Sequence, residues 1–342
     1  MSENNQASAE ITTTVVIPNY NGMKFLPGCM ASLDRQNYRG FRILMIDNAS
    51  KDGSVEWMRE HYPDIELVVN DENLGFSGAV NQGIAMSTTP YVILLNNDTE
   101  VDADYVGELV KSISASDRIF SVSAKMIRYY ERELMDDAGD LYNIIGWGFQ
   151  RGIGQPVERY EKNNVRVFTA CAGAAIYRRA IFDEIGLFDL MHFAYLEDID
   201  VGYRARIYGY RNLYCSKAIV YHIGSGTSAD GKKYNSFKVK LAARNNVYLN
   251  YKNMPVLQYI INWLPIKFGN LLKQQFFRKN GFGDDFAEGL REGRANRKNC
   301  KKVPFKWKHL WNYLVIEWEL ICNMFIYTAD YFRRHRGKKT EK

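Results

Sequence analysis

An apolar run of five residues, Tyr91–Leu95, ends abruptly in the polar triplet Asn96-Asn97-Asp98. The length and composition of the run predict a buried strand, which puts the triplet at the carboxyl end of that strand. Ligands of open α/β sheets bind at the carboxyl ends of the strands. A carboxylate held there is well placed to bind a hard cation against phosphate oxygens. The run therefore predicts an α/β sheet with a polar, acidic edge that binds ligands.

Strand-like and helix-like segments alternate along most of the chain. Strands are predicted at Thr12–Ile17, Phe41–Ile46, Glu66–Val69, Tyr91–Leu95 and Leu213–Tyr221, and helices at Met23–Gln36, Asp52–Met58, Gly78–Met86, Arg178–Ile185 and Asp198–Tyr208. This alternation predicts a Rossmann-like, doubly wound and mostly parallel sheet. Residues from about Val122 to Arg166 are predicted to form irregular excursions over that sheet.

The length of 342 residues favours one large α/β domain with a C-terminal extension. Its five cysteines are scattered without CxxC spacing, which argues against a structural zinc site or a disulfide framework. Residues 1–11 are polar, so we expect a disordered N-terminus without a signal peptide. We also expect no transmembrane helix, because no run of about eighteen uncharged apolar residues occurs.

From residue 251 onward the chain becomes aromatic and basic. Segments 256–279 and 310–332 carry Trp and Phe among Lys and Arg, and four of the six tryptophans lie in this last quarter. Such amphipathic helices are typical of a membrane interface. Packing on the α/β domain or on a second subunit is the alternative, so a homodimer stays open. Basic tails also suit nucleic acid, but the acidic strand ends disfavour that partner.

Five segments in order resemble inverting family-2 glycosyltransferases with the GT-A fold. They are VIPNYN (16–21), IDNASKDGS (46–54), NLGFSGAVNQG (73–83), LLNND (94–98) and FAYLEDIDVGYR (193–204), the last followed by His222. The resemblance covers roughly residues 12–250 and is closest to rhamnosyltransferases of bacterial surface polysaccharides. It implies a nucleotide-sugar-binding half at 12–100, an acceptor half at 101–250 and a helical extension at 251–342.

The first two segments are expected to hold the donor nucleotide. Pro18 and Tyr20 follow the first strand, where a base can stack on the tyrosine ring; a simple turn residue is the alternative. Asp47 ends the second strand and can accept the N3–H of uracil or thymine. It can equally cap a turn with Asn48.

The third segment is expected to line the donor sugar. Asn73 and Gly75 allow the backbone to pass close to the nucleotide sugar. Asn81 lies further along the predicted helix, from which it can reach a phosphate or a sugar hydroxyl. The glycines of this segment support the prediction only because the segment lies between two recognised motifs.

The triplet 96–98 occupies the place of the family's DXD motif. The resemblance implies that Asp98 ligates Mn²⁺ or Mg²⁺ against the diphosphate, with His222 completing the metal site. Asn96 departs from the motif because it carries no charge, although it can still hydrogen-bond a ribose hydroxyl, and Asn97 joins the donor-binding residues. One carboxylate gives a weaker metal site, so metal affinity is expected to depend on the nucleotide. A structural histidine is the alternative for His222.

Glu197 and Asp198 resemble the family's catalytic acidic pair. Inverting transfer needs a base that takes the proton of the acceptor hydroxyl, and we assign that role to Asp198, with Glu197 orienting it or binding the acceptor. A structural acidic cluster at a helix N-terminus is the alternative. Asp200 lies four residues before Arg204 and is expected to form a helical ion pair. Trp147, flanked by glycines, is predicted to be a platform for an acceptor sugar or else a core residue.

These expectations describe a metal-dependent inverting glycosyltransferase. We expect it to move L-rhamnose from dTDP-rhamnose to a lipid-linked saccharide in bacterial cell-wall or surface polysaccharide synthesis. The basic, aromatic C-terminal region would attach it to anionic lipid at the cytoplasmic face of the plasma membrane. A UDP-sugar donor (glucose, galactose or an N-acetylhexosamine) is the main alternative. An inactive nucleotide-sugar-binding protein is a further one, which intact Asp98, Asp198 and His222 disfavour.

Overall fold

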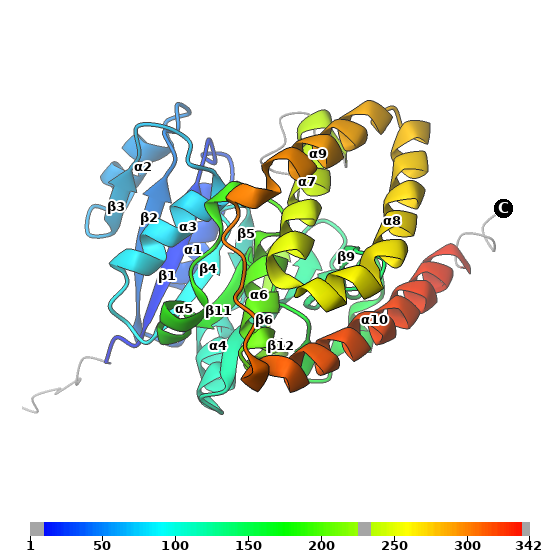
Figure 1. Cartoon of the computed structure of the whole chain (residues 1–342). Coiled ribbons are helices and arrows are strands. Elements are labelled where there is room, and N and C mark those ends of the chain that lie inside the picture. The colour runs from blue at the N-terminus through cyan, green and yellow to red at the C-terminus, as the bar shows by residue number, and fades with distance from the viewer. Residues whose placement is uncertain (1–9, 225–233, 337–342) are drawn as a thin grey trace, which may run out of the picture.

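The computed structural model describes residues 10–224 and 234–336 of the chain. Almost all of the expected disordered N-terminus, residues 1–11, and of the Gly-Ser stretch at 224–228 lies outside these ranges. A ten-stranded sheet forms the centre, and helices cover both of its faces (Figure 1). The C-terminal helices extend from one side of this sheet.

The strands are β1 (Thr13–Asn19), β2 (Phe41–Asp47), β3 (Glu66–Val69), β4 (Tyr91–Leu95), β5 (Thr99–Val101), β6 (Ile119–Arg128), β7 (Met135–Asp137), β8 (Asp140–Tyr142), β9 (Gly148–Gln150), β10 (Val165–Val167), β11 (Ala174–Arg178) and β12 (Arg211–His222). The helices are α1 (Leu26–Asp34), α2 (Ser54–His61), α3 (Gly75–Met86), α4 (Tyr105–Ser114), α5 (Arg179–Ile185), α6 (Glu197–Ile207), α7 (Ser236–Asn253), α8 (Val256–Lys279), α9 (Gly283–Asn296) and α10 (Leu310–Arg336). The path through the sheet runs β10-β12-β6-β11-β4-β1-β2-β3, with β5 and β7 pairing at its side.

The strands β3, β2, β1 and β4 are parallel, as the alternation of segments predicts. Val15–Ile17 in β1 and Val92–Leu95 in β4 are fully buried, because helices cover both faces of this half of the sheet. The expected doubly wound, mostly parallel sheet is therefore confirmed. Its parallel register brings the carboxyl ends of β1, β2 and β4 to one edge.

The second half of the sheet contains β6, and here the prediction of irregular excursions from Val122 is wrong. β6 is a long strand, antiparallel to β11 and parallel to β12. Polar residues at buried positions hide it from pattern analysis. Ser121 donates a hydrogen bond to Asn212, and Lys125 forms an ion pair with Glu161. These partners lie far away in sequence, so the local pattern does not reveal that the polar groups are satisfied.

The helix α8 has an unusual distribution of side chains. Its buried residues are Gln258, Asn262 and Gly269, whereas its apolar residues Leu257, Ile261, Leu264, Phe268 and Leu271 are exposed. Gln258 and Asn262 donate hydrogen bonds to Glu317 on α10. The polar side of α8 thus faces the protein, the reverse of an ordinary surface helix. Within the described residues, every helix is too short or too polar to cross a bilayer.

A buried ionic network joins α6 to α7. Asp200 is fully buried, and its carboxylate accepts hydrogen bonds from Arg204 (3.1 Å), Lys252 (2.9 Å) and Asn253 (2.7 Å). Burial alone raises the pKa of Asp200, but the charges of Lys252 and Arg204 hold that pKa well below its usual range. The expected ion pair with Arg204 is confirmed, and its extension to α7 fixes the first turn of α6.

Replacing Asp200 with Asn is expected to lower the free energy of unfolding by about 3–5 kcal/mol, because Arg204 is left buried without a carboxylate. Urea denaturation measures this loss. Asp183→Asn removes an exposed carboxylate that also lies four residues from an arginine, at 3.9 Å, and is the matched control. The control should change stability by less than about 1 kcal/mol. Equal effects of the two substitutions would contradict the stabilising role of the network.

Candidate active site

The carboxyl ends of β1, β2 and β4 are joined by a buried chain of polar side chains. The amide of Asn97 donates to Asn19 Oδ1, and Asn19 Nδ2 donates to Asp47 Oδ2 at 2.7 Å. All three residues are buried. These three side chains lie buried below the ligand-binding edge of the sheet. The side chain of Asn97 is therefore bonded to Asn19 rather than open to the donor, as its predicted role would need.

Asp47 is also a turn residue. Its second carboxylate oxygen accepts a hydrogen bond from the backbone N–H of Ser50 at 2.8 Å. The carboxylate is fully buried against these protein donors, and its binding of a pyrimidine N3–H stays a prediction. The turn-capping alternative is the one that the structure contains.

The other predicted donor residues divide into exposed and occupied ones. Tyr20 is 44% exposed, and Pro18 beside it is partly exposed, so the tyrosine ring is open to a stacking base. Asn73 caps the turn before α3 by accepting from the N–H of Gly75. Asn81 exchanges two hydrogen bonds with the backbone of Phe188, at 2.8 and 3.0 Å. Asn81 is thus occupied by protein partners, and its contact with a phosphate or a sugar hydroxyl stays a prediction.

Gly75 is placed close to the loop before α6. Its φ of +72° lies in the left-handed region, and a Cβ there would meet Phe193 at 2.5 Å. A side chain at position 75 would therefore both strain the backbone and push this loop away. Gly75 thus lets the start of α3 lie close to the loop that contains Phe193. The prediction instead had this glycine bring the backbone close to the donor sugar.

The predicted metal ligands Asp98 and His222 do come together. β12 pairs with β5 so that His222 lies opposite Thr99, and His222 Nε2 is 3.5 Å from Asp98 Oδ2. The other ring nitrogen, Nδ1, lies 2.6 Å from Asp136 Oδ2. Burial alone lowers the pKa of His222, but its hydrogen bonds to Asp136 and Asp98 raise that pKa to about 10. In metal-binding histidines one ring nitrogen is commonly held by a carboxylate while the other faces the ion, so the arrangement of His222 fits the predicted metal site.

Asn96 precedes Asp98 by two residues, and its side chain differs from those of Asp98 and His222 in its contacts. It is partly exposed, and none of the hydrogen bonds recorded between described residues uses its side-chain amide. A Cβ at Gly173 would lie 2.9 Å from Asn96 Nδ2, so the glycine leaves room for the amide. The amide is free to bond a ribose hydroxyl, as predicted.

A second acidic cluster lies at the N-terminus of α6. Asp198 is partly exposed, and its Oδ1 accepts from the N–H of Ile199 at 2.7 Å. Asp140 lies beside it, and burial together with the charges of Asp137 and Asp198 raises the pKa of Asp140 well above its usual value. Burial also raises the pKa of Asp198, and burial with the charge of Asp198 raises the pKa of Glu197 to about 8. Burial and mutual repulsion thus favour the protonated forms of these carboxyl groups.

The strand β7 connects the two acidic groups. Its consecutive residues Asp136 and Asp137 contact His222 and the carboxylates around Asp198, respectively. Sequence reasoning missed both residues, although the adjacent pair of aspartates was visible. Asp137, Asp140 and Cys171 offer ligand atoms within 4.8 Å of one another. A thiol among carboxylates is a poor donor set for Mg²⁺ or Mn²⁺, so Asp98 and His222 remain the better metal ligands.

The loop before Glu197 is strained and is held by α7. Phe193, Tyr195 and Leu196 have φ values of 62°, 70° and 65°, which are unusual for residues other than glycine. Asn245 on α7 donates to the carbonyls of Ala194 and Tyr195, each at 2.8 Å. Strain that is maintained in this way is typical of functional sites.

Trp147 does not fit the predicted acceptor platform. Its indole N–H donates to the carbonyl of Gly269 on α8 at 3.2 Å, and its ring packs edge-on against Tyr327 on α10, with centroids 5.4 Å apart. The ammonium of Lys273 lies 5.4 Å from the ring centroid. Trp147 therefore packs the C-terminal helices α8 and α10 against the α/β domain, which is a structural role.

The N-terminal half of the chain matches a known family. The family model described as Glycosyl transferase family 2 matches residues 14–186. The N-acetylglucosaminyl-diphospho-decaprenol L-rhamnosyltransferase of Mycobacterium tuberculosis is 26% identical over 230 residues, which is 61% of this chain and 75% of that protein. The uncharacterized glycosyltransferase YwdF of Bacillus subtilis is 26% identical over 253 residues, which is 71% of this chain and 88% of that protein.

Two solved structures share the fold at low sequence identity. The mannosyltransferase PcManGT from Pyrobaculum calidifontis, in complex with GDP-Man and Mn²⁺, gives a TM-score of 0.52 at 16% identity and covers 84% of this chain and 76% of its own. GalNAc-T7 with UDP, GalNAc and Mn²⁺ gives 0.57 at 19% identity and covers 85% of this chain and 55% of its own. The expected GT-A fold is thereby confirmed.

Replacing Asp136 with Asn is expected to weaken Mn²⁺ binding about 10–100-fold, because His222 loses the carboxylate that orients its ring. Isothermal titration calorimetry with Mn²⁺ measures this change. Asp117→Asn removes an exposed carboxylate that pairs with Arg178 at 3.4 Å and is the matched control. If Asp136→Asn bound Mn²⁺ as tightly as the wild type, the metal site would not include His222 as described.

Proposed function

Because the chain belongs to glycosyl transferase family 2, we propose that it transfers L-rhamnose from dTDP-rhamnose to a lipid-linked saccharide, with inversion at the anomeric carbon. The observation that carries this proposal is the pairing of Asp98 with His222 next to the acidic cluster around Asp198, with β7 contacting both. The Mycobacterium tuberculosis relative, named for an L-rhamnosyl transfer to a diphospho-decaprenol acceptor, supports the choice of sugar and acceptor class.

The residues divide between the leaving group and the acceptor. Asp98 and His222 would hold Mn²⁺ or Mg²⁺, which supplies positive charge to the departing diphosphate. Asp198 takes the proton of the acceptor hydroxyl while the hydroxyl oxygen attacks the anomeric carbon, and the bond from that carbon to the diphosphate breaks. Burial raises the pKa of Asp198, which makes its carboxylate a stronger base for the proton of the acceptor hydroxyl.

The donor alternative is a UDP-sugar. The exposed ring of Tyr20 supports stacking of either pyrimidine base and does not discriminate between them. Thermal unfolding with dTDP-rhamnose, UDP-glucose, UDP-galactose and UDP-N-acetylglucosamine, each with and without Mn²⁺, tests the donor, because ligands of the native state raise its melting temperature. A Mn²⁺-dependent shift with dTDP-rhamnose is expected, and a shift with UDP-sugars alone would replace the donor.

Replacing Asp198 with Asn is expected to lower kcat about 10²–10⁴-fold, because the acceptor hydroxyl loses its base. The melting-temperature shift with donor and Mn²⁺ should remain. In the wild type, the acid limb of the kcat profile should lie above the ordinary aspartate value of 3.8, because the pKa of Asp198 is raised and only its deprotonated form accepts a proton. Near-normal turnover of the variant would remove Asp198 from this role.

The exposed residues Leu257, Ile261, Leu264, Phe268 and Leu271 form an apolar stripe on α8. We propose that this stripe and the tryptophans of α10 attach the protein to anionic lipid at the cytoplasmic face of a membrane. On α10, Trp311, Trp318 and Phe325 recur every seven residues and are 73%, 66% and 71% exposed. Such spacing puts them on one side of the helix. Lys302, Lys306 and Lys308 lie just before this helix and would favour anionic headgroups.

Replacing both Trp311 and Trp318 with Glu is expected to weaken binding to phosphatidylglycerol vesicles at least tenfold, because two large apolar side chains are lost from the contact. Vesicle sedimentation measures the change. Tyr130→Glu alters an exposed aromatic residue outside these helices and should leave binding unchanged. Undiminished sedimentation of the double variant would show that this surface does not contact lipid.

A further inference from the structure

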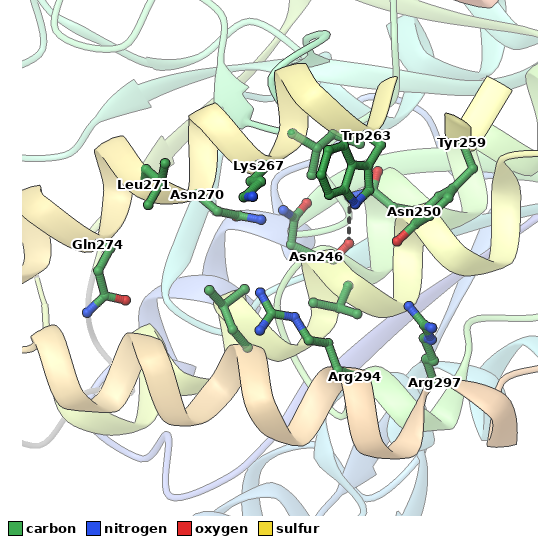
Figure 2. A pocket seen from close by; sticks show the side chains of 13 residues that line it. Asn246, Asn250, Tyr259, Trp263, Lys267, Asn270, Leu271, Gln274, Arg294 and Arg297 are labelled. Carbon is green, nitrogen blue, oxygen red and sulfur yellow. Dashed lines mark hydrogen bonds between the residues drawn. The ribbon is translucent and has the colours of Figure 1, made fainter. Parts of the chain in front are cut away.

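A pocket of 460 Å³ lies between α7, α8 and α9 (Figure 2), and it is lined by none of the residues assigned above to donor, metal or proton transfer. α8 and α9 form opposite walls, and α7 forms the floor between them. The lining residues are Asn246, Val247, Asn250, Tyr259, Trp263, Ile266, Lys267, Asn270, Leu271, Gln274, Leu290, Arg294 and Arg297.

The pocket carries positive charge that no neighbouring carboxylate balances. Lys267 comes from α8, and Arg294 and Arg297 come from the end of α9 and the turn after it, while the lining includes no Asp or Glu. Among residues 10–224 and 234–333, none of the ion pairs recorded involves these three cations. By contrast, Arg244 on α7 pairs with Glu292 at 3.1 Å. Lys267 lies over the ring of Trp263, at 4.9 Å from its centroid, and Arg297 over that of Tyr251, at 5.5 Å, so an anionic ligand would supply the charge that these aromatic contacts do not.

Amide side chains add hydrogen-bond donors to this charge. Four amide side chains line the pocket, those of Asn246, Asn250, Asn270 and Gln274. Asn250 donates to the carbonyl of Asn246 and Gln274 to that of Gly283, so the amide donors of Asn246 and Asn270 are the ones that no hydrogen bond recorded between described residues uses. The hydroxyl of Tyr142 donates to Asn246 Oδ1 or to Asn250 Oδ1, each at 2.8 Å, which fixes the orientation of these two amides. Arginines and amides together suit a group with several anionic oxygens, such as a phosphate or diphosphate.

The surroundings of the pocket connect it with both the lipid-facing surface and the active site. Trp263 and Leu271 line the pocket and belong to α8, whose neighbouring side carries the exposed apolar stripe. On the other side, Tyr142 ends β8, the strand that begins with Asp140. α7 contributes Asn246 to the pocket and Asn245 to the strained loop before Glu197. The apolar part of a ligand held here would lie near the stripe, and α7 would link the ligand to the loop before Glu197.

We infer that this pocket binds the diphosphate that joins lipid and saccharide in the acceptor. The inference rests on the proposed function for the identity of the acceptor, and on the unbalanced cations, the oriented amides and the adjacent apolar stripe for the site. The arginines and Lys267 would bond the diphosphate oxygens, and the stripe would accompany the prenyl chain.

Calorimetric titration of the full chain with geranyl diphosphate tests the inference without donor or transfer. Replacing Arg294 and Arg297 together with Gln should weaken binding at least tenfold, because two charge-assisted sets of hydrogen bonds are lost. Arg291→Gln with Lys298→Gln removes the same charge from the same two elements, outside the pocket, and should bind as the wild type does. The Mn²⁺-dependent thermal shift with donor should persist in every variant, which shows that each one is folded.

Several results would overturn the inference. These are absence of geranyl diphosphate binding by the wild type, equal losses in the test and control variants, or equal binding of geraniol. Full competition by phosphatidylglycerol vesicles at equal phosphate concentration would assign the pocket to bulk lipid headgroups instead. Because the titration contains no donor, its failure leaves rhamnose transfer standing. A failed donor assay would likewise leave the titration result intact.

Discussion

The carboxylate of Asp200 is the contact on which the active site depends. It joins the first turn of α6, which carries Glu197 and Asp198, to Lys252 and Asn253 on α7. The loop before that turn contains three residues other than glycine with positive φ, each costing about 1–3 kcal/mol. Such a backbone persists only when its surroundings hold it. Since α7 starts at Ser236 and the family match ends at residue 186, the site is completed by chain outside the matched region.

Charge balance explains why two acidic groups can lie so close together. His222 lies between two carboxylates, and its hydrogen bonds to both raise its pKa, so binding of a metal through Nε2 would require loss of the ring proton that faces Asp98. Around Asp140 no cation is available among the described neighbours, and burial shifts the balance toward protonation instead. The negative charge of the first group is offset by the His222 ring, and that of the second group is reduced by protonation of its carboxyl groups. They meet at β7, where consecutive residues serve one group each.

Local patterns in the sequence predicted the strands and helices well. They predicted the site only for those residues whose role follows from their place at the end of a strand. The apolar runs of β1 and β4 and the ends of their strands were visible, and so was the meeting of Asp98 with His222 through the resemblance. The roles of Asp47, Asn81 and Asn97 were not, because each side chain is occupied by a partner elsewhere in the chain. Asn81 bonds a backbone 107 residues away, and Trp147 bonds one 122 residues away. A pattern shows where a polar group lies but not whether another residue already satisfies it.

The helix α8 gives the clearest reason to assign a function to the C-terminal helices. Its polar residues Gln258 and Asn262 face α10, and its leucines, isoleucine and phenylalanine face outward. Burial of apolar surface is the main force that folds proteins in water, so an exposed apolar stripe of this length opposes stability unless something covers it. A second subunit would cover it too, but would not require the exposed tryptophans and the lysines that surround them. Lipid accounts for all three features together, because aromatic rings and cations both favour the membrane–water boundary. Under the proposed function, the same surface would bring a lipid-linked acceptor to the helices that hold the loop before Glu197.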